Sequence, residues 1–251
     1  MKYLLFICAD GVAGTPQDEA TVREGMPGWL DEMDRRGIRV YGHALKPVET
    51  ATTVRVRGGE TLLTDGPFAE SKEFIGGFDI LECANLDDAV EAAALHPLSW
   101  VHKIEVRPFY VEEIGGEMQP IAPIEDVRHG QRFLLLMCLD GIRAAPEVEE
   151  AVVRDSMAWY EELKARGVAV YGAPLNHAET ATTVRVRNGE TVLSDGPFTE
   201  TKEFIGGFTI LDCEGQAEAV ALAAKHPLAS HHMVEVRQFA GHELGDGAIG
   251  D

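Results

Sequence analysis

The chain opens with a short apolar run, and the same pattern of apolar and polar positions starts again at residue 131. Residues 1–9 are mostly apolar and end at Asp10, and residues 133–139 form the equivalent run in the second half. A run this short with a sharp polar end is typical of a buried strand. Residues 18–36 then place apolar side chains seven and four positions apart and end at Gly37. This spacing predicts a helix with a glycine at its end.

The pattern then changes from helical spacing to alternation. Residues 53–57 and 60–63 resemble two strands around a Gly-Gly turn, which the second half replaces with Asn188-Gly189. Asn-Gly between two strand-like runs strongly indicates a hairpin. The next segment, Asp65-Gly-Pro-Phe68, has the composition of a turn.

Three further elements close the unit. Residues 74–83 predict a strand, in which Gly76-Gly77 indicates a bulge or a close approach to the backbone. Residues 86–96 predict a second helix, which His96-Pro97 ends. Residues 103–107 alternate like a half-buried strand.

The two halves are copies of one unit. Residues 1–109 align with 131–239 at a constant offset of 130, without a gap and with about half of the positions identical. A period of this length indicates a duplicated domain, because solenoid repeats have periods of roughly 20–50 residues. We therefore expect a first domain at 1–110, a linker at 111–130, a second domain at 131–240 and a tail at 241–251.

The order of elements in each unit predicts its architecture. Strand, helix, two or three strands, strand, helix and strand give an antiparallel sheet with its helices on one face, in the ferredoxin-like manner. The other face of each sheet needs a cover. We predict an α+β fold in which the two ferredoxin-like units pack sheet to sheet, as an intrachain pseudo-dimeric α+β barrel.

Charge and composition exclude several functions. The net charge is −20 and there is no cluster of Lys and Arg, so nucleic acid is not expected as a partner. The first apolar run has a twin in mid-chain, which argues for a strand rather than a signal peptide. No apolar stretch reaches the roughly 20 residues of a membrane helix. The four cysteines lack metal-ligand spacing and lie in apolar runs, so we expect buried free thiols and a cytoplasmic protein.

Strand alternation predicts which charged side chains face the space between the sheets. If the valines of residues 53–57 and Ile104 pack on the helices, the opposite face carries charged residues in both copies. Such charges either form ion pairs that fix register and domain orientation, or donate hydrogen bonds to an anionic or oxygen-rich small molecule. The candidate ligand-binding residues are Arg55, Glu105, Arg107, Arg185, Glu235 and Arg237.

A second set of twinned residues includes candidate proton carriers. The acids near the Asp-Gly-Pro-Phe turn cap backbone amides or include a general base with a raised pKa. His96 and its twin cap a helix end or take part in acid/base chemistry. The candidate catalytic residues are Asp65, Glu73, His96, Asp195, Glu203 and His226. No metal site and no cofactor are expected, because metal-ligand spacing, a phosphate-binding loop and a dinucleotide motif are all missing.

A long motif resembles a known family. Thr-Ala-Thr-Thr-Val-Arg-Val-Arg, then Asp-Gly-Pro-Phe-x-Glu-x-Lys-Glu-x-x-Gly-Gly-Phe and a closing Glu-Val-Arg occur in both halves. They resemble the DGPF-domain group of YCII-related proteins. The resemblance implies a dimeric α+β barrel and no general activity, although some members act on small ring compounds and DGPF proteins are often encoded beside sigma factors. The founding type has a His–Asp pair, but Met26 and Ser156 stand at the position of its histidine.

Two functions remain open at this point. The leading hypothesis is a barrel that binds a small polar or aromatic molecule, with cofactor-independent acid/base chemistry on it. The alternative is a non-catalytic regulatory or protein-interaction module. Further pairing of the chain into a homodimer is left open.

Overall fold

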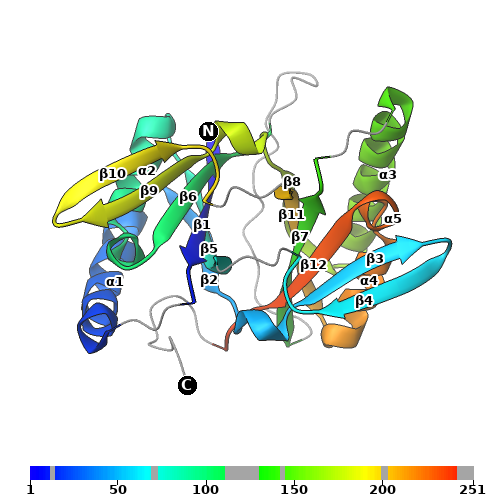
Figure 1. Ribbon diagram of the computed structural model, residues 1–251, viewed down its shortest axis with the longest axis horizontal. Coiled ribbons are helices and arrows are strands. Elements are labelled where there is room, and N and C mark those ends of the chain that lie inside the picture. The colour runs from blue at the N-terminus through cyan, green and yellow to red at the C-terminus, as the bar shows by residue number, and fades with distance from the viewer. Residues whose placement is uncertain (12–14, 69–72, 111–129, 142–144, 199–202, 242–251) are drawn as a thin grey trace.

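A computed structural model of the chain describes residues 1–11, 15–68, 73–110, 130–141, 145–198 and 203–241 (Figure 1). Of the predicted linker only Gly130 is among the described residues, and of the predicted tail only Gly241. The elements of the first repeat are β1 (Lys2–Ala9), α1 (Pro16–Arg36), β2 (Arg39–Ala44), η1 (Val48–Thr50), β3 (Thr52–Arg57), β4 (Glu60–Asp65), β5 (Phe74–Glu82), α2 (Leu86–Leu95), η2 (Pro97–Trp100) and β6 (Lys103–Pro108). The second repeat has β7 (Gln131–Leu139), α3 (Pro146–Ala165), β8 (Ala169–Pro174), η3 (Ala178–Thr180), β9 (Thr182–Arg187), β10 (Glu190–Asp195), β11 (Phe204–Cys213), α4 (Gln216–Lys225), α5 (Leu228–His231) and β12 (Met233–Gln238).

The local signals of the sequence form the expected structures. Gly37 follows α1 with φ of 66°, in the left-handed region that favours glycine. Asn188 and Gly189 have φ of 53° and 82°, as a tight turn between β9 and β10 requires. The β1–β5 ladder shifts register at Gly76, which is left out of the pairing between Ile7–Gly77 and Cys8–Ile75, as a bulge requires. All four cysteines are free and buried, as the sequence predicts.

The twelve described strands form two antiparallel six-stranded sheets. The first sheet has the order β10-β9-β6-β1-β5-β2, and the second has β4-β3-β12-β7-β11-β8. Each sheet therefore includes a hairpin from the other repeat. This exchange departs from the expectation that each unit would complete its own sheet.

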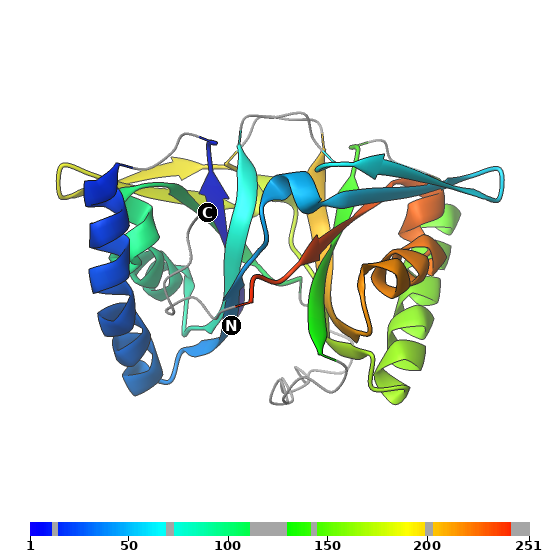
Figure 2. The ribbon, with the colours of Figure 1, turned by 90° about the horizontal axis from the view of Figure 1, so that it is seen from below.

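The exchanged hairpins join the last strand of the opposite repeat. In the first sheet Glu105 of β6 pairs with Thr183 of β9, and in the second Glu235 of β12 pairs with Thr53 of β3. Figure 2 shows the β9–β10 hairpin on the side of α1 and α2, and the β3–β4 hairpin on the side of α3 and α4. The two repeats are thus connected through both sheets.

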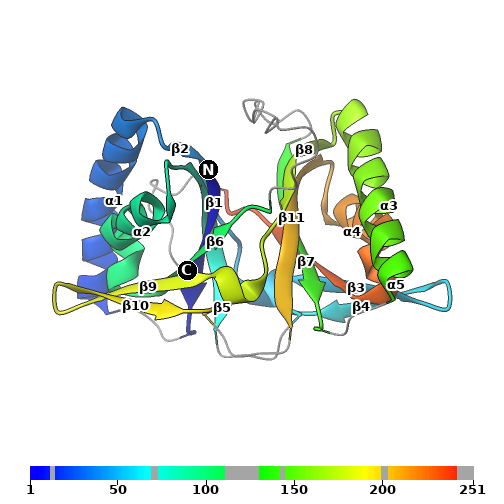
Figure 3. The same cartoon turned by 90° about the horizontal axis from the view of Figure 1, so that it is seen from above.

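Helices cover the outer face of each sheet, and the inner faces oppose one another (Figure 3). One buried cluster lies between the sheets and draws apolar residues from both, including Phe6, Phe78, Leu136 and Phe208. Each sheet has one further buried cluster, which lies between the sheet and the helices that cover it. This arrangement confirms the sheet-to-sheet packing, and the layer between the sheets is largely apolar. Within the described residues, no helix is both long and apolar enough to cross a membrane.

Alternation sorts the side chains as predicted. Val54, Ile104 and Val106 are buried in the clusters on the helix side. Glu105 and Arg107 are also buried, on the opposite face of β6. Phe109 lies in the cluster between the sheets.

Candidate functional site

Polar side chains gather where the central strands β1 and β7 end. In the first sheet Ala9 pairs with Phe74 and Cys8 pairs with Lys103. The residues that flank these pairs are Asp10, Glu73 and His102. They therefore lie at the same end of three neighbouring strands, β1, β5 and β6. The same register in the second sheet brings together Asp140, Glu203 and His232.

Each of these groups receives an arginine from the other repeat. Arg185 of β9 donates from Nη2 to the Val101 carbonyl at 3.4 Å, beside His102. Burial and the charge of Arg187 lower the pKa of Arg185, while Asp10 and Glu73 oppose that shift. In the second sheet Arg55 of β3 contacts the sulfur of Met233, next to His232. We call these groups the first site (Asp10, Glu73, His102, Lys103, Arg185) and the second site (Asp140, Glu203, His232, Met233, Arg55).

The second site contains a hydrogen-bonded histidine–aspartate pair. His232 Nδ1 lies 3.0 Å from Asp140 Oδ1, with side chains 15% and 30% exposed. In the first site, His102 Nδ1 is buried and has no hydrogen-bond partner among the described residues. Burial lowers the pKa of His102, Asp10 raises it and Arg185 lowers it further. Each histidine thus has a carboxylate of its own repeat nearby, and a guanidinium of the other repeat acts on His102 or contacts Met233, the residue after His232.

A lysine distinguishes the two sites. Lys103 forms an ion pair with Glu73, and its Nζ lies 3.5 Å from the carbonyl of Phe198. Met233 occupies the equivalent position in the second site. The first site therefore has one more cation.

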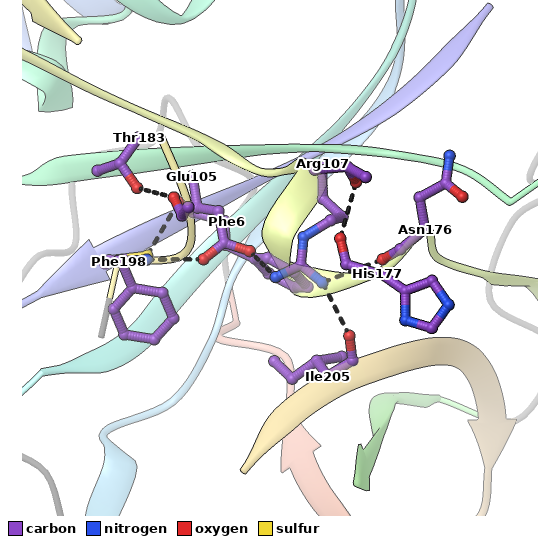
Figure 4. A network of polar contacts seen from close by, with 11 residues as sticks. Phe6, Glu105, Arg107, Asn176, His177, Thr183, Phe198 and Ile205 are labelled. Carbon is purple, nitrogen blue, oxygen red and sulfur yellow. Dashed lines mark hydrogen bonds and ion pairs between the residues drawn. The ribbon is translucent and has the colours of Figure 1, made fainter. Parts of the chain in front are cut away.

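Behind each site a buried Glu–Arg pair holds the repeats together, and Figure 4 shows the pair of the first site. Arg107 is paired with Glu105 and donates to the carbonyls of Ile205 at 3.1 Å and Asn176 at 3.3 Å. Glu105 Oε2 also accepts from the Phe198 amide at 2.9 Å. All three partners outside β6 belong to the second repeat. We call this group the first clamp.

The second clamp repeats this geometry. Arg237 lies 3.2 Å from Glu235 and donates to the carbonyls of Ile75 at 2.8 Å and Lys46 at 3.0 Å. Glu235 Oε2 accepts from the Phe68 amide at 2.9 Å. Burial raises the pKa of both glutamates, and the paired arginines oppose that shift. The Asp-Gly-Pro-Phe turn of each repeat is therefore anchored on the other repeat.

The predicted ligand-binding residues fall into two groups. Glu105, Arg107, Glu235 and Arg237 form the clamps, in the register and orientation role that charged strand faces can have. Arg55 and Arg185 reach the sites instead. Arg55 does not lie beside Glu105, because β3 pairs with β12 and not with β6.

The predicted proton carriers are also divided. Glu73 and Glu203 lie at the sites, whereas Asp65 and Asp195 end the exposed strands β4 and β10. The turn residues Glu70 and Lys72, which accompany Asp65 in the sequence motif, lie outside the described residues.

His96 and His226 are buried on the helix side of the sheets. His96 Nδ1 accepts from the Leu98 amide at 3.1 Å, and its ring meets Trp29 edge-on at 4.3 Å. Its Nε2 lies 3.5 Å from Asp79 Oδ2. His226 caps the Leu228 amide at 3.2 Å, and burial lowers the pKa of this imidazole to about 4. Both histidines cap the turn that follows a helix.

The sequence-based set of site residues missed Asp10, Asp140, His102 and His232. A signal was available, because these residues survive the duplication and stand at strand ends. What the sequence could not give is the arginine opposite each histidine, which depends on the hairpin exchange. Within the described part of the chain, no group of three or more His, Cys, Asp or Glu side chains could hold a metal ion.

Comparison with known proteins gives a family and no activity. The chain is 49% identical to "Uncharacterized protein R00369" of Rhizobium meliloti (strain 1021) over 49 residues, which is 20% of this chain and 40% of that protein. The crystal structure of "Putative Chlorite dismutase TA0507" has a TM-score of 0.44 and 8% identity, over 98% of this chain and 96% of that one. The YCII-related domain matches twice, at residues 1–110 and 133–240. With a family domain in each repeat, the chain belongs to the YCII-related family.

Proposed function

We propose that this chain binds a small polar or aromatic molecule with an anionic or oxygen-rich group at the two sites, and transfers a proton without a cofactor. The observation that carries this proposal is the hydrogen bond between His232 and Asp140, at 3.0 Å, in a partly exposed position beside Arg55. A histidine, an orienting carboxylate and a cation are the parts that general base catalysis on an acidic ligand uses.

The hydrogen bond assigns a role to each atom. If Nδ1 of His232 carries the proton that Asp140 accepts, Nε2 is left as the base. Nε2 then takes a proton from a C–H or O–H group of the ligand, and the electron pair of the broken bond stays on the ligand as negative charge. The guanidinium of Arg55 stabilises that charge, and Asp140 stabilises the imidazolium. Returning the proton to another ligand atom completes an isomerisation.

The placement of the sites also supports a small ligand. The layer between the sheets is largely apolar, so a ligand would bind where the central strands end rather than deep inside the barrel. Two surface cavities of about 300 and 290 Å³ lie between α3 and α4 and between α1 and the end of α2. They contain neither His232 nor His102, so they are separate from the proposed chemistry.

A screen of small carboxylates, phenols and phosphates by thermal shift tests the binding, followed by calorimetry on each compound that stabilises the chain. The Arg55→Ala/Arg185→Ala variant should lose about 10- to 100-fold in affinity, because a hydrogen bond to a charged group contributes roughly 1.5–3 kcal/mol. Arg154→Ala, on the exposed face of α3, is the matched control and should bind like the wild type. Equal affinity in the double variant, or no stabilising compound at all, would refute the proposal.

A second candidate function is a protein-interaction module. The outer strands β4 and β10 are exposed along their whole length and carry Leu62, Leu63, Val192 and Leu193, each about half exposed. Exposed edge strands offer unpaired backbone groups to another chain. This function predicts that Leu62→Lys/Val192→Lys abolishes partner binding while Arg55→Ala/Arg185→Ala leaves it intact. The reverse pattern would exclude the edges as the binding surface.

A further inference from the structure

We propose that the two sites are unequal: the second site is the one assembled for proton transfer, and Arg57 of the first repeat positions His232 in it. This inference rests on the proposed function and specifies which copy performs it. It assigns to Arg57 a role as a positioning residue, since Arg57 acts through the backbone that carries His232.

The guanidinium of Arg57 holds the turn before His232 from the opposite repeat. Its Nη1 donates to the carbonyls of Ala229 at 3.1 Å and Ser230 at 3.0 Å. Its Nη2 lies 3.2 Å from the carbonyl of His231 and 3.4 Å from that of His232. These are the carbonyl groups that the end of a helix leaves without intrahelical partners. One side chain therefore fixes the backbone of residues 229–232.

The consequence is visible at the side chain of His232. With its backbone held by Arg57, His232 meets Asp140 at 3.0 Å. Asp140 follows β7 and His232 precedes β12, so the pair also depends on the register of these two central strands. Arg55, which completes the second site, lies on β3, and the hairpin exchange places β3 beside β12.

The first repeat lacks this support although its residue types are the same. Arg187 occupies the position of Arg57, but within the described residues it makes no hydrogen bond to the turn before His102. That turn is the 3-10 helix η2, and His102 Nδ1 has no hydrogen-bond partner among the described residues. Arg185 instead donates to the carbonyl of Val101 at 3.4 Å.

Two substitutions between the repeats accompany the different contacts of these turns. Ser99 donates its hydroxyl to the Ala94 carbonyl at 3.0 Å and ties η2 to α2, whereas Ala229 has no hydroxyl at that position. Ser230 stands in place of the bulky Trp100, and the Ser230 carbonyl accepts from Arg57 at 3.0 Å. The difference between the sites is therefore encoded in the chain.

Charge separates the sites in the same direction. Lys103 and Arg185 both lie at the first site, where Met233 replaces the lysine in the second. Two cations favour an anionic ligand but disfavour the imidazolium that proton transfer creates. Burial together with Arg185 lowers the pKa of His102, while Asp10 and Asp18 oppose that shift. The first site is thus suited to binding and poorly suited to act as a base.

The experiment is ¹⁵N NMR of the imidazole groups in the protein without ligand, with the imidazole groups in their neutral form. We expect His232 to be dominated by the Nδ1–H tautomer and His102 by the Nε2–H tautomer. Resonances are assigned with His232→Asn and His102→Asn. Asp140→Asn should convert His232 to the Nε2–H form, which calibrates the readout.

The variants then test Arg57. Arg57→Ala should remove the dominance of the Nδ1–H form at His232, Arg57→Lys should restore part of it, and the matched control Arg187→Ala should change neither histidine. If His232 keeps its tautomer in Arg57→Ala, or if His102 and His232 have the same tautomer in the wild type, this inference is wrong. The measurement needs no ligand, so a failed ligand screen would refute the proposed function and leave this result standing.

Discussion

The first clamp should make stability depend on a single buried arginine. Arg107 and Glu105 are 2% and 1% exposed, and Arg107 donates to two carbonyls of the other repeat. Arg107→Met keeps the apolar part of the side chain and leaves the carboxylate of Glu105 buried without its partner. Removing one member of a buried ion pair typically costs about 3–5 kcal/mol.

The structure allows that cost to be worked out. A buried carboxylate that loses its cation takes up a proton, which limits the penalty. From the ordinary pKa of 4.5, protonation at pH 7 costs about 3.4 kcal/mol, at about 1.36 kcal/mol per pH unit. The two lost hydrogen bonds to carbonyls add about 1 kcal/mol each. The total loss at pH 7 is therefore at most about 5.4 kcal/mol.

The sign of the pH dependence follows from the raised pKa of Glu105. An acid whose folded pKa lies above its unfolded value is destabilising at high pH, and the effect disappears as the pH falls toward the unfolded value. At pH 5 protonation costs only about 0.7 kcal/mol. The difference between Arg107→Met and wild type should therefore shrink by about 2 to 3 kcal/mol from pH 7 to pH 5.

Urea unfolding followed by circular dichroism at both pH values measures this difference. Arg237→Met in the second clamp should behave alike, and Glu105→Gln/Arg107→Met should lose less than Arg107→Met because no charge stays buried. A loss below about 1 kcal/mol for Arg107→Met, or one that is the same at both pH values, would refute a buried clamp.

Three other predictions concern single positions. Burial lowers the pKa of His226 to about 4 from 6.5, so stability should fall as the pH drops from 6.5 to 4, by up to about 3.4 kcal/mol, and His226→Gln should flatten this part of the pH–stability curve. Asp79 accepts from Arg39 at 2.8 Å in a fully buried position, so Asp79→Asn should cost about 1.5–3 kcal/mol in urea unfolding, whereas Thr209→Ser in the other repeat should cost less. Gly58 has φ of 60°, so Gly58→Ala should lower the free energy of unfolding by about 1 kcal/mol. Gly58→Asn should leave it nearly unchanged, because Asn188 has a similar φ of 53° in the twin turn, and melting temperatures would show whether the two variants differ.

Local patterns predicted most of the elements. The alternation of residues 103–107 placed Ile104 and Glu105 on opposite faces of β6, and the structure has them there. The Asn-Gly signal gave the β9–β10 hairpin, and helical spacing gave α1 with its end at Gly37. These features depend on neighbours in sequence, so the sequence contains all the information they need.

The hairpin exchange could not be predicted in this way. Residues 49–57 and 179–187 are identical, so the hydrophobic pattern of β3 fits β6 and β12 equally well. Pairing within or between repeats then depends on chain geometry rather than on the pattern of side chains. For the same reason the sequence could not predict that Arg185 binds the Val101 carbonyl beside His102, or that Arg55 contacts Met233 beside His232. The sequence shows the residues that each repeat contributes to its own site, but it does not show the arginine that comes from the other repeat.

The claim that each site is built from both repeats is tested most directly by the titration of His102. Burial lowers the pKa of His102, and the charge of Arg185 from the second repeat lowers it further. In an NMR titration Arg185→Ala should therefore raise the pKa of His102, and Arg55→Ala, the twin substitution in the repeat of His102, should leave it unchanged. A shift of His102 in Arg55→Ala with none in Arg185→Ala would mean that each repeat keeps its own hairpin, and would contradict the composite sites.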